Sequence, residues 1–245
     1  MMNEWRAFII APERTHHLIQ GEPAYTHRFD EVLTFHSPGL AAVRDRSGAY
    51  HIESTGQAIY VERYLRTFGF YQDRAAVQAV DGWMHILSSG KPLYLERYAW
   101  CGNFQEERCP VRLFDQRYLH LGLDGRAVYA QDYRYAGDYY DGIAVVQRED
   151  GLHTHITRVG ELVHGRWLLD LGVFHKGIAR ARDEQGWHHI NASGHPLYQR
   201  RFAAIEPFYN GQARVEDLDS SLLVIDEQGE IRVRLRHAHG QTNAL

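Results

Sequence analysis

The 245-residue chain has almost no lysine and no long apolar run. Lys91 and Lys176 are the only lysines, so arginine carries nearly all of the positive charge, and the net charge is −4. A chain without excess positive charge has no overall field to recruit nucleic acid or an acidic lipid surface, and we expect neither as a partner. Because no run of about 18 apolar residues occurs, no membrane-spanning helix is expected.

Cysteine is also scarce, and the usual catalytic motifs are missing. Cys101 and Cys109 are the only cysteines, and as a pair they match neither a zinc site nor a redox motif. The N-terminal MMNEWRAFII is too short and too charged for a secretory signal, which favours a cytoplasmic protein with reduced thiols. The sequence contains no G-x-S-x-G, P-loop, G-x-G-x-x-G or H-E-x-x-H. We therefore expect no enzymatic activity and no cofactor.

What the chain does have is an internal repeat. "GKPLYLERYAWCGNF" at 90–104 aligns with "GQAIYVERYLRTFGF" at 56–70 and "GHPLYQRRFAAIEPF" at 194–208. The glycines that open these segments recur every 34 or 35 residues, at Gly21, Gly56, Gly90, Gly125, Gly160, Gly194 and Gly229. A fixed period of this length indicates a repeat architecture. One domain, 1–245, is expected, with units at about 7–40, 41–74, 75–108, 109–142, 143–177, 178–211 and 212–245.

Each unit has the pattern of three short strands. In the third unit an apolar run at 75–80 and an aromatic segment at 83–87 flank a polar turn, and the glycine turn leads to 92–98. Alternation along 92–98 predicts a strand with Tyr94, Glu96 and Tyr98 on one face, whereas 99–108 is expected to be a loop anchored by Phe104. No helical period of 3.6 residues extends over a long window.

The predicted fold is therefore all-β. It consists of seven antiparallel meanders stacked as an open superhelix, or solenoid, in which each unit contacts only its neighbours. The alternative is a closed seven-bladed β-propeller, although propeller blades usually hold four strands and 34 residues is short for that. The last unit departs from the pattern, because it keeps only Val233, Arg236 and His237 of the third-strand motif and has no phenylalanine anchor.

The units resemble the bacterial WG repeat. The segment "DGWMHI" followed by "GKPLY" is similar to its order of Trp-Gly-aromatic-Ile, polar glycine turn and apolar strand leading to Tyr. This chain departs from that order at Met84 and His188, which replace the glycine, and the Trp itself stands only at Trp83 and Trp187. The resemblance implies a binding or interaction module of variable repeat number. Similar arrays also accompany methyltransferase domains, so a role accessory to a biosynthetic enzyme or methyltransferase is one implication.

Histidine, with 16 copies, is unusually frequent. Five residues before six of the seven glycines stands a histidine: His16, His51, His85, His120, His155 and His189. A residue repeated six times is more often structural than catalytic, since an active site needs one asymmetric constellation. We expect each ring to pack as an aromatic would and to bond a loop carbonyl or a carboxylate.

A metal site is the alternative for the histidines. His153 and His155 point the same way from one predicted strand, and His237 and His239 repeat that spacing near the C-terminus. A zinc site needs further ligands, and none is identifiable. These histidines are therefore only weak candidates for metal binding, and no metal is expected.

Arginine recurs at a second register. It stands three residues after the Tyr position of the third strand in five of the seven units, and one residue earlier in the fifth: Arg28, Arg63, Arg97, Arg166, Arg201 and Arg236. A line of guanidinium groups suits an elongated acidic partner. The alternative is that each arginine stacks on an aromatic ring of an adjacent unit and pairs with acids such as Glu62 and Glu96.

These patterns favour a non-catalytic scaffold that presents its repeats to a protein or peptide partner. The predicted contact residues are Trp83, Trp187, Tyr118, Arg63, Arg97 and Arg201, because exposed aromatic rings can anchor a peptide. A module that binds carbohydrate or another small ligand through its repeated aromatics is the first alternative. A histidine-based metalloprotein is the second.

Overall fold

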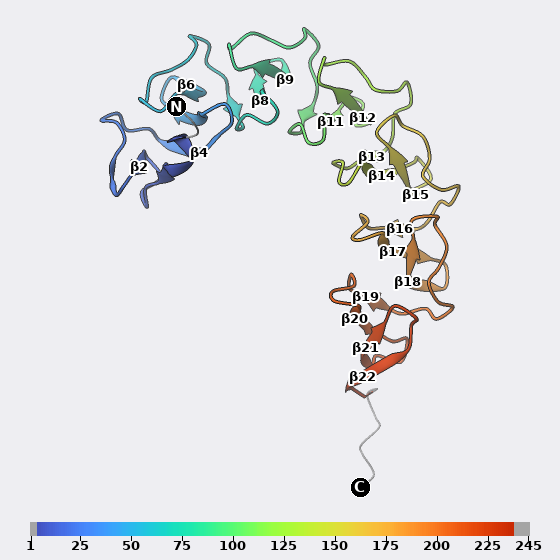
Figure 1. Ribbon diagram of the computed structural model, residues 1–245. Helices are drawn as coiled ribbons and strands as arrows, with labels where there is room; N and C mark the ends of the chain where they lie inside the picture. Colours follow the sequence, from blue (N-terminus) through green and yellow to red (C-terminus); the bar gives the residue numbers. More distant parts are fainter. Residues whose placement is uncertain (1–3, 238–245) are drawn as a thin grey trace. The chain divides into compact units, whose positions relative to one another are not determined.

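The structure, a computed structural model, describes residues 4–237 and is built from short strands (Figure 1). Apart from the 3-10 turn η1 (Glu4–Ala7), the regular elements of the described residues are 22 strands in seven antiparallel sheets. The all-β class and the sevenfold repetition are thus confirmed. The chain divides into two compact parts, residues 1–132 and 133–245.

Within the first part, four sheets follow one another along the chain. They are β1(Ile9–Ile10)–β2(His17–Ile19)–β3(Glu22–Pro23), β4(Glu31–His36)–β5(Leu40–Asp45)–β6(Gly48–Ile52), β7(Arg66–Thr67)–β8(Arg74–Ala79)–β9(Gly82–Leu87) and β10(Trp100–Cys101)–β11(Arg108–Arg112)–β12(Tyr118–Gly122).

The second part holds the other three sheets. They are β13(Tyr135–Ala136)–β14(Ile143–Gln147)–β15(His153–Thr157), β16(Asp170–Leu171)–β17(Ile178–Asp183)–β18(Gly186–Asn191) and β19(Ala204–Ile205)–β20(Gln212–Glu216)–β21(Leu222–Asp226)–β22(Ile231–Arg236).

The two predicted strands that precede each glycine turn form a regular hairpin. In the third repeat, Ala75 pairs with Ile86 and Val77 with Met84. Consecutive residues of both strands are buried, so the pattern is not the alternation of a sheet with one wet face. Both faces of the hairpin are covered by protein, which explains why these runs are almost continuously apolar.

The third predicted strand, 92–98, is the main error of the sequence-based prediction. It meets β9 only at two isolated bridges, Ile86↔Pro92 and Trp83↔Tyr98. The two bridges are three residues apart on β9 but six residues apart on the opposite segment. The additional residues of that segment loop outward as a large bulge. Leu95 in this bulge is 85% exposed. The expected alternation of Tyr94, Glu96 and Tyr98 on one face is consequently wrong.

A short strand lies instead in the tail that was expected to be a loop. Trp100 and Cys101 form β10, which pairs with Arg112 and Val111 of β11. β11 belongs to the following repeat, so the sheets are shifted relative to the predicted units, although the repeat length is correct. Each tail thus adds an edge strand to the next hairpin and ties consecutive repeats together.

The last repeat shows what the bulge depends on. Here β22 pairs with β21 as a strand of six residues, with two register shifts, and Val224 lies directly opposite Val233. These two valines occupy the positions of the recurrent histidine and tyrosine. Where both side chains are valine, the segment pairs as a strand; where they are histidine and an aromatic partner, it bulges.

Consecutive repeats are packed through the turn glycines. A Cβ built on Gly56 would lie 2.7 Å from Cγ of Tyr25, and one built on Gly90 would lie 2.7 Å from Cβ of Tyr60. In the second part, Gly194 and Gly229 lie equally close to the ring that precedes each of them along the chain, at His164 and Tyr198 respectively. These glycines have φ between +77° and +84°, so both the backbone and the packing require glycine.

Candidate binding groove

The recurrent histidines form buried dyads with a residue nine positions further along the chain. His51 Nδ1 lies 2.5 Å from the hydroxyl of Tyr60, and His85 Nδ1 lies 2.6 Å from that of Tyr94. His189 Nδ1 bonds the hydroxyl of Tyr198 at 2.5 Å. All three imidazoles are fully buried, and His120 forms the same contact with Tyr129.

In the dyads of His17, His51, His85 and His189, the second ring nitrogen bonds a backbone carbonyl. His51 Nε2 donates to the carbonyl of Phe68 at 2.7 Å, and His189 Nε2 donates to that of Glu206 at 2.9 Å. Because a carbonyl only accepts, the hydrogen is on Nε2, and Nδ1 of the neutral ring accepts the tyrosine hydroxyl hydrogen. The expected carbonyl bond is therefore present. In these repeats it connects the hairpin to the segment that supplies the next edge strand.

In the first repeat, His17 and not the predicted His16 occupies the position of the dyad histidine. In the first repeat it is His17 whose Nδ1 bonds Tyr25, at 2.6 Å, and whose Nε2 bonds the carbonyl of Leu33, at 2.9 Å. The hairpin here closes with Ile19 opposite Glu22, so its turn has one residue fewer than the turns of later repeats. Counting back from the glycine therefore lands one residue too early.

The fifth repeat has a histidine pair in place of the histidine–tyrosine dyad. His155 Nδ1 lies 3.0 Å from His164 Nε2, and His155 Nε2 bonds the carbonyl of Gly172 at 2.9 Å. Both nitrogens of His155 are thus engaged, whereas the buried Nδ1 of His153 has no hydrogen-bond partner. Within residues 4–237, no three histidine, cysteine, aspartate or glutamate side chains lie close enough together to hold a metal ion. His239 lies outside the described residues.

Burial lowers the pKa of the dyad histidines. Desolvation is the largest cause, and it brings the pKa of His51, His85, His155 and His189 to about 4, although the carbonyl hydrogen bond opposes the shift. These imidazoles are therefore neutral at pH 7. Neutral rings with both nitrogens engaged serve packing rather than proton transfer.

Tyr60→Phe is expected to destabilise the protein by about 1–3 kcal/mol, because it leaves Nδ1 of the buried His51 without a donor. The measurement is the free energy of unfolding from a denaturant titration. The matched control is Tyr209→Phe, since Tyr209 is 77% exposed and its hydroxyl can be solvated. Equal stabilities of the two variants would contradict the structural role of the dyad.

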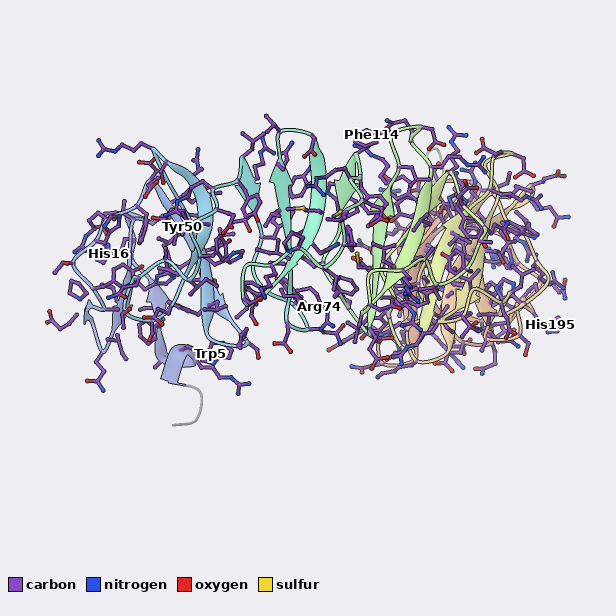
Figure 2. All side chains as sticks on the ribbon, turned by 90° about the horizontal axis from the view of Figure 1, so that it is seen from above. Trp5, His16, Tyr50, Arg74, Phe114 and His195 are labelled. Carbon is purple, nitrogen blue, oxygen red and sulfur yellow. The ribbon has the colours of Figure 1, made fainter. Side chains whose placement is uncertain are left out.

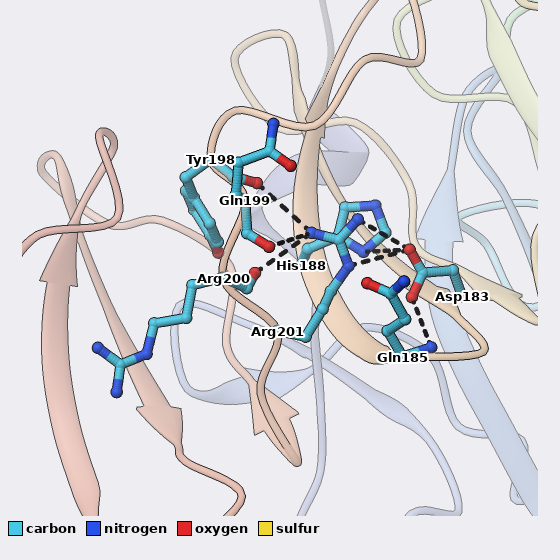
Figure 3. Close-up of polar contacts among 7 residues, drawn as sticks. All are labelled: Asp183, Gln185, His188, Tyr198, Gln199, Arg200 and Arg201. Atoms are coloured by element: carbon cyan, nitrogen blue, oxygen red, sulfur yellow. Dashed lines mark hydrogen bonds and ion pairs between the residues drawn. The ribbon is translucent and has the colours of Figure 1, made fainter.

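The recurrent arginines cap their own bulges. The Nη1 of Arg201 lies 3.5, 3.0 and 3.3 Å from the carbonyls of Tyr198, Gln199 and Arg200 (Figure 3). Its Nε and Nη2 bond Asp183 at 2.9 and 2.8 Å. Arg63 donates to three carbonyls in the same way, and Arg97 donates to two.

The acidic partners of these arginines were not predicted correctly. Arg97 pairs with Asp81 at 3.0 Å rather than with Glu96, and Arg63 lies 3.7 Å above the ring of Tyr50 rather than against Glu62. These partners come from the hairpin of the same repeat, Asp81 from its turn and Tyr50 from β6. A guanidinium that holds carbonyls, an aspartate or a ring in its own loop has few donors left for a partner. The predicted contact residues Arg63, Arg97 and Arg201 therefore stabilise the bulge.

The predicted aromatic contacts are also less accessible than expected. Trp83 is only 7% exposed and stacks on Phe68, with ring centroids 5.3 Å apart and planes at 14°. Trp187 and Tyr118 are half-buried, and Arg180 lies 5.9 Å from the ring centroid of Trp187. Trp83 is thus not an exposed ligand platform. Its ring supports Phe68, which is 36% exposed.

Two adjoining cavities lie between the second and third sheets, in the first part of the chain. The larger, of about 550 Å³, lies at the hairpin ends and is lined by Gly48, Tyr64, Leu65, Val80 and their neighbours. The other, of about 410 Å³, is lined by Leu33, Ala42, Ala49, Phe68 and their neighbours. They share Arg44 and Leu65, and together we call them the junction groove.

Two apolar side chains that line the junction groove are strongly exposed. Val80 is 95% exposed and Leu65 is 56% exposed, although both flank polar turns. Sequence reasoning missed these residues because each lies at a position that varies between repeats and belongs to no motif. The only sequence signal is an apolar residue immediately before the Asp81-Gly82 turn.

Comparisons with known proteins leave the family open. Neither a scan against protein-family models nor a search of curated proteins found a match. Among solved structures, BamB from Moraxella catarrhalis is 15% identical, with a TM-score of 0.47 and coverage of 89% of this chain and 78% of that chain. The computationally designed Ika8 protein is 14% identical, with a TM-score of 0.44 and coverage of 94% and 84%.

A third structure, KlHsv2 with loop 6CD replaced by a Gly-Ser linker, is 9% identical, with a TM-score of 0.44 and coverage of 83% and 80%. Because all three TM-scores are under 0.5, these likenesses carry no argument about function. The described residues include no helix with the length and apolar character needed to span a bilayer.

Proposed function

We propose that the protein is a non-catalytic scaffold that binds a protein or peptide partner in the junction groove. The observation that carries the proposal is the groove itself, where Leu65, Phe68 and Val80 leave apolar surface exposed beside two adjoining cavities. Exposed apolar surface that lines a concave site is the usual mark of a binding site. An elongated groove of two cavities suits an extended segment of polypeptide.

The chemistry of the groove supports binding rather than catalysis. Its lining contains no histidine or cysteine, and one of its three carboxylates, Asp45, accepts hydrogen bonds from Ser47 and Tyr50. Those hydrogen bonds help to hold the pKa of Asp45 below its ordinary value despite partial desolvation, so the group stays ionised and is a poor general base at neutral pH. The lining therefore offers side chains for recognition.

An open array is the architecture that accompanies this proposal. In a closed propeller, the glycine turn of the first repeat would pack against the last repeat, just as later turn glycines pack against an aromatic side chain of the preceding repeat. The last repeat has Val233 where the others place an aromatic side chain, so it offers no ring for such a contact. Small-angle scattering tests this, since a compact closed chain should match the radius of gyration of a globular protein.

The test of the function is a selection of binding peptides from a random library displayed on phage, with the full chain as bait. Peptides that bind wild type should lose more than about tenfold in affinity for Leu65→Glu, because the new charge enters the apolar groove. The matched control is Leu169→Glu. Leu169 occupies the same repeat position in the second part of the chain and is 44% exposed. Equal affinities for the two variants would contradict the groove as the binding site.

A further inference from the structure

The larger cavity of the junction groove has an occupied counterpart in the next repeat. Adding the repeat length of 34 to Gly48 and Val80 gives Gly82 and Phe114. A Cβ built on Gly82 would lie 3.1 Å from Cζ of Phe114, so the phenylalanine ring lies over this glycine. Figure 2 shows Phe114 at one end of the strands and Arg74 toward the other.

Over Gly48 the equivalent ring is missing. The residue at the position of Phe114 is Val80, which is too short to cover Gly48 and is 95% exposed. A cavity of about 550 Å³ remains, and Gly48, Tyr64, Leu65 and Val80 are among its lining residues. The scaffold thus leaves an aromatic-sized position open in one repeat and fills it with its own side chain in the next. We call the open position the Gly48 slot.

The surroundings of the slot favour negative charge. Among the described residues, the guanidinium groups of Arg46 and Arg66, which line the two cavities, form no ion pair or side-chain hydrogen bond. Arg44 lies 3.7 Å from Glu31. Only one lining carboxylate, that of Glu62, is similarly unpaired. An acidic group beside the slot can therefore form a charge-assisted contact with Arg46, and one in the adjoining cavity can do so with Arg66.

We propose that the Gly48 slot receives an aromatic side chain of an extended partner peptide, and that an acidic residue of the peptide pairs with Arg66 or Arg46. The inference rests on the proposed function, because it names the chemistry that the junction groove selects. The aromatic ring would lie over Gly48 as Phe114 lies over Gly82. Glycine at both positions leaves room for a flat ring against the backbone, and an aromatic anchor in a pocket is a frequent hot spot of binding.

The experiment compares peptides from a random phage library on the full-length wild type, on Val80→Phe and on Leu218→Phe. Val80→Phe supplies the ring that the next repeat carries, whereas Leu218, which occupies the same position in the last repeat and is 68% exposed, lies outside the junction groove. We expect the selected peptides to be enriched in an aromatic residue near Asp or Glu. Their affinity should fall more than about tenfold for Val80→Phe and remain within about twofold for Leu218→Phe. Arg66→Glu should weaken the acidic peptides and spare versions in which their acids are replaced by Gln.

The outcomes separate the slot from the wider function. Peptides without an aromatic residue, or binding that Val80→Phe leaves unchanged, would overturn the slot, even if Leu65→Glu still abolished binding and the scaffold function stood. If no peptide bound wild type more tightly than it bound Leu65→Glu, both proposals would fall. Circular dichroism and a thermal melt of each variant show that it is folded, which is expected because the changed side chains are exposed.

Discussion

Gly90→Ala is expected to destabilise the protein by about 2–4 kcal/mol, one of the largest effects of any single methyl group in this fold. The new Cβ meets the ring of Tyr60 at 2.7 Å, and Tyr60 is buried against its own histidine, so neither partner has room to move. Overpacking of a core typically costs about 1–3 kcal/mol. The left-handed φ of +81° adds about 1 kcal/mol for any residue with a Cβ. Denaturant titration measures the sum.

Gly21→Ala is the matched control for this prediction. Gly21 occupies the same turn in the first repeat and has φ of +85°, but no atom lies within 4 Å of a built Cβ. The control should therefore lose only the backbone contribution of about 1 kcal/mol. If both variants lost the same stability, the contact between the glycine turn and the ring of the preceding repeat would not be what couples the repeats.

The second large effect is a loss of stability in mild acid. The dyad histidines have a pKa of about 4 in the folded protein, against an ordinary value of 6.5 in the unfolded chain. Because the unfolded state binds the protons first, the stability is fully present above about pH 6.5 and is lost as the pH falls toward 4. Between these values each imidazole contributes a slope of up to about 1.4 kcal/mol per pH unit. Below pH 4 the contribution levels off.

The measurement is the free energy of unfolding at several pH values between 7 and 5. Carboxylates with a lowered pKa, such as Asp45 and Asp183, act mainly below their ordinary value of 3.8, so they do not interfere in this range. His51→Gln should reduce the pH slope by about one proton, because it removes one imidazole whose pKa is lowered in the folded protein. A free energy of unfolding that did not change between pH 6.5 and 5 would show that the dyads are not buried as neutral rings.

The repeat, the hairpins and the class of fold were predictable from the sequence, because each rests on local patterns. Glycine spacing of 34 or 35 residues and apolar runs such as 75–80 specify a turn and a strand within a few neighbouring residues. Cys109 lies in one of these apolar strands and is fully buried for the same reason. Local sequence sufficed wherever the structure follows a simple period.

The errors arose where a distant contact overrides that period. The segment 92–98 alternates like a strand, but Tyr94 bonds His85 while Tyr98 pairs with Trp83, and the residues between them are forced outward. Arg97 then caps the carbonyls of this loop, which removes it from the surface that sequence reasoning had assigned to a partner. A hydrogen bond across nine residues of chain is not visible in an alternating pattern.

For the candidate site, too, one part was predictable from the sequence and the other depends on the tertiary structure. The sequence by itself determined that the chain is a sevenfold β repeat with histidine, tyrosine, arginine and glycine at fixed registers, because registers are a property of the chain. Only the tertiary structure decided that the histidines and tyrosines face inward, that the arginines bond their own loops, and that exposed apolar surface lies at variable positions such as Leu65 and Val80. The physical reason is packing between repeats. Residues that recur at a fixed register make the contacts within and between repeats. A position that varies makes no such contact, so a small side chain there can leave a cavity.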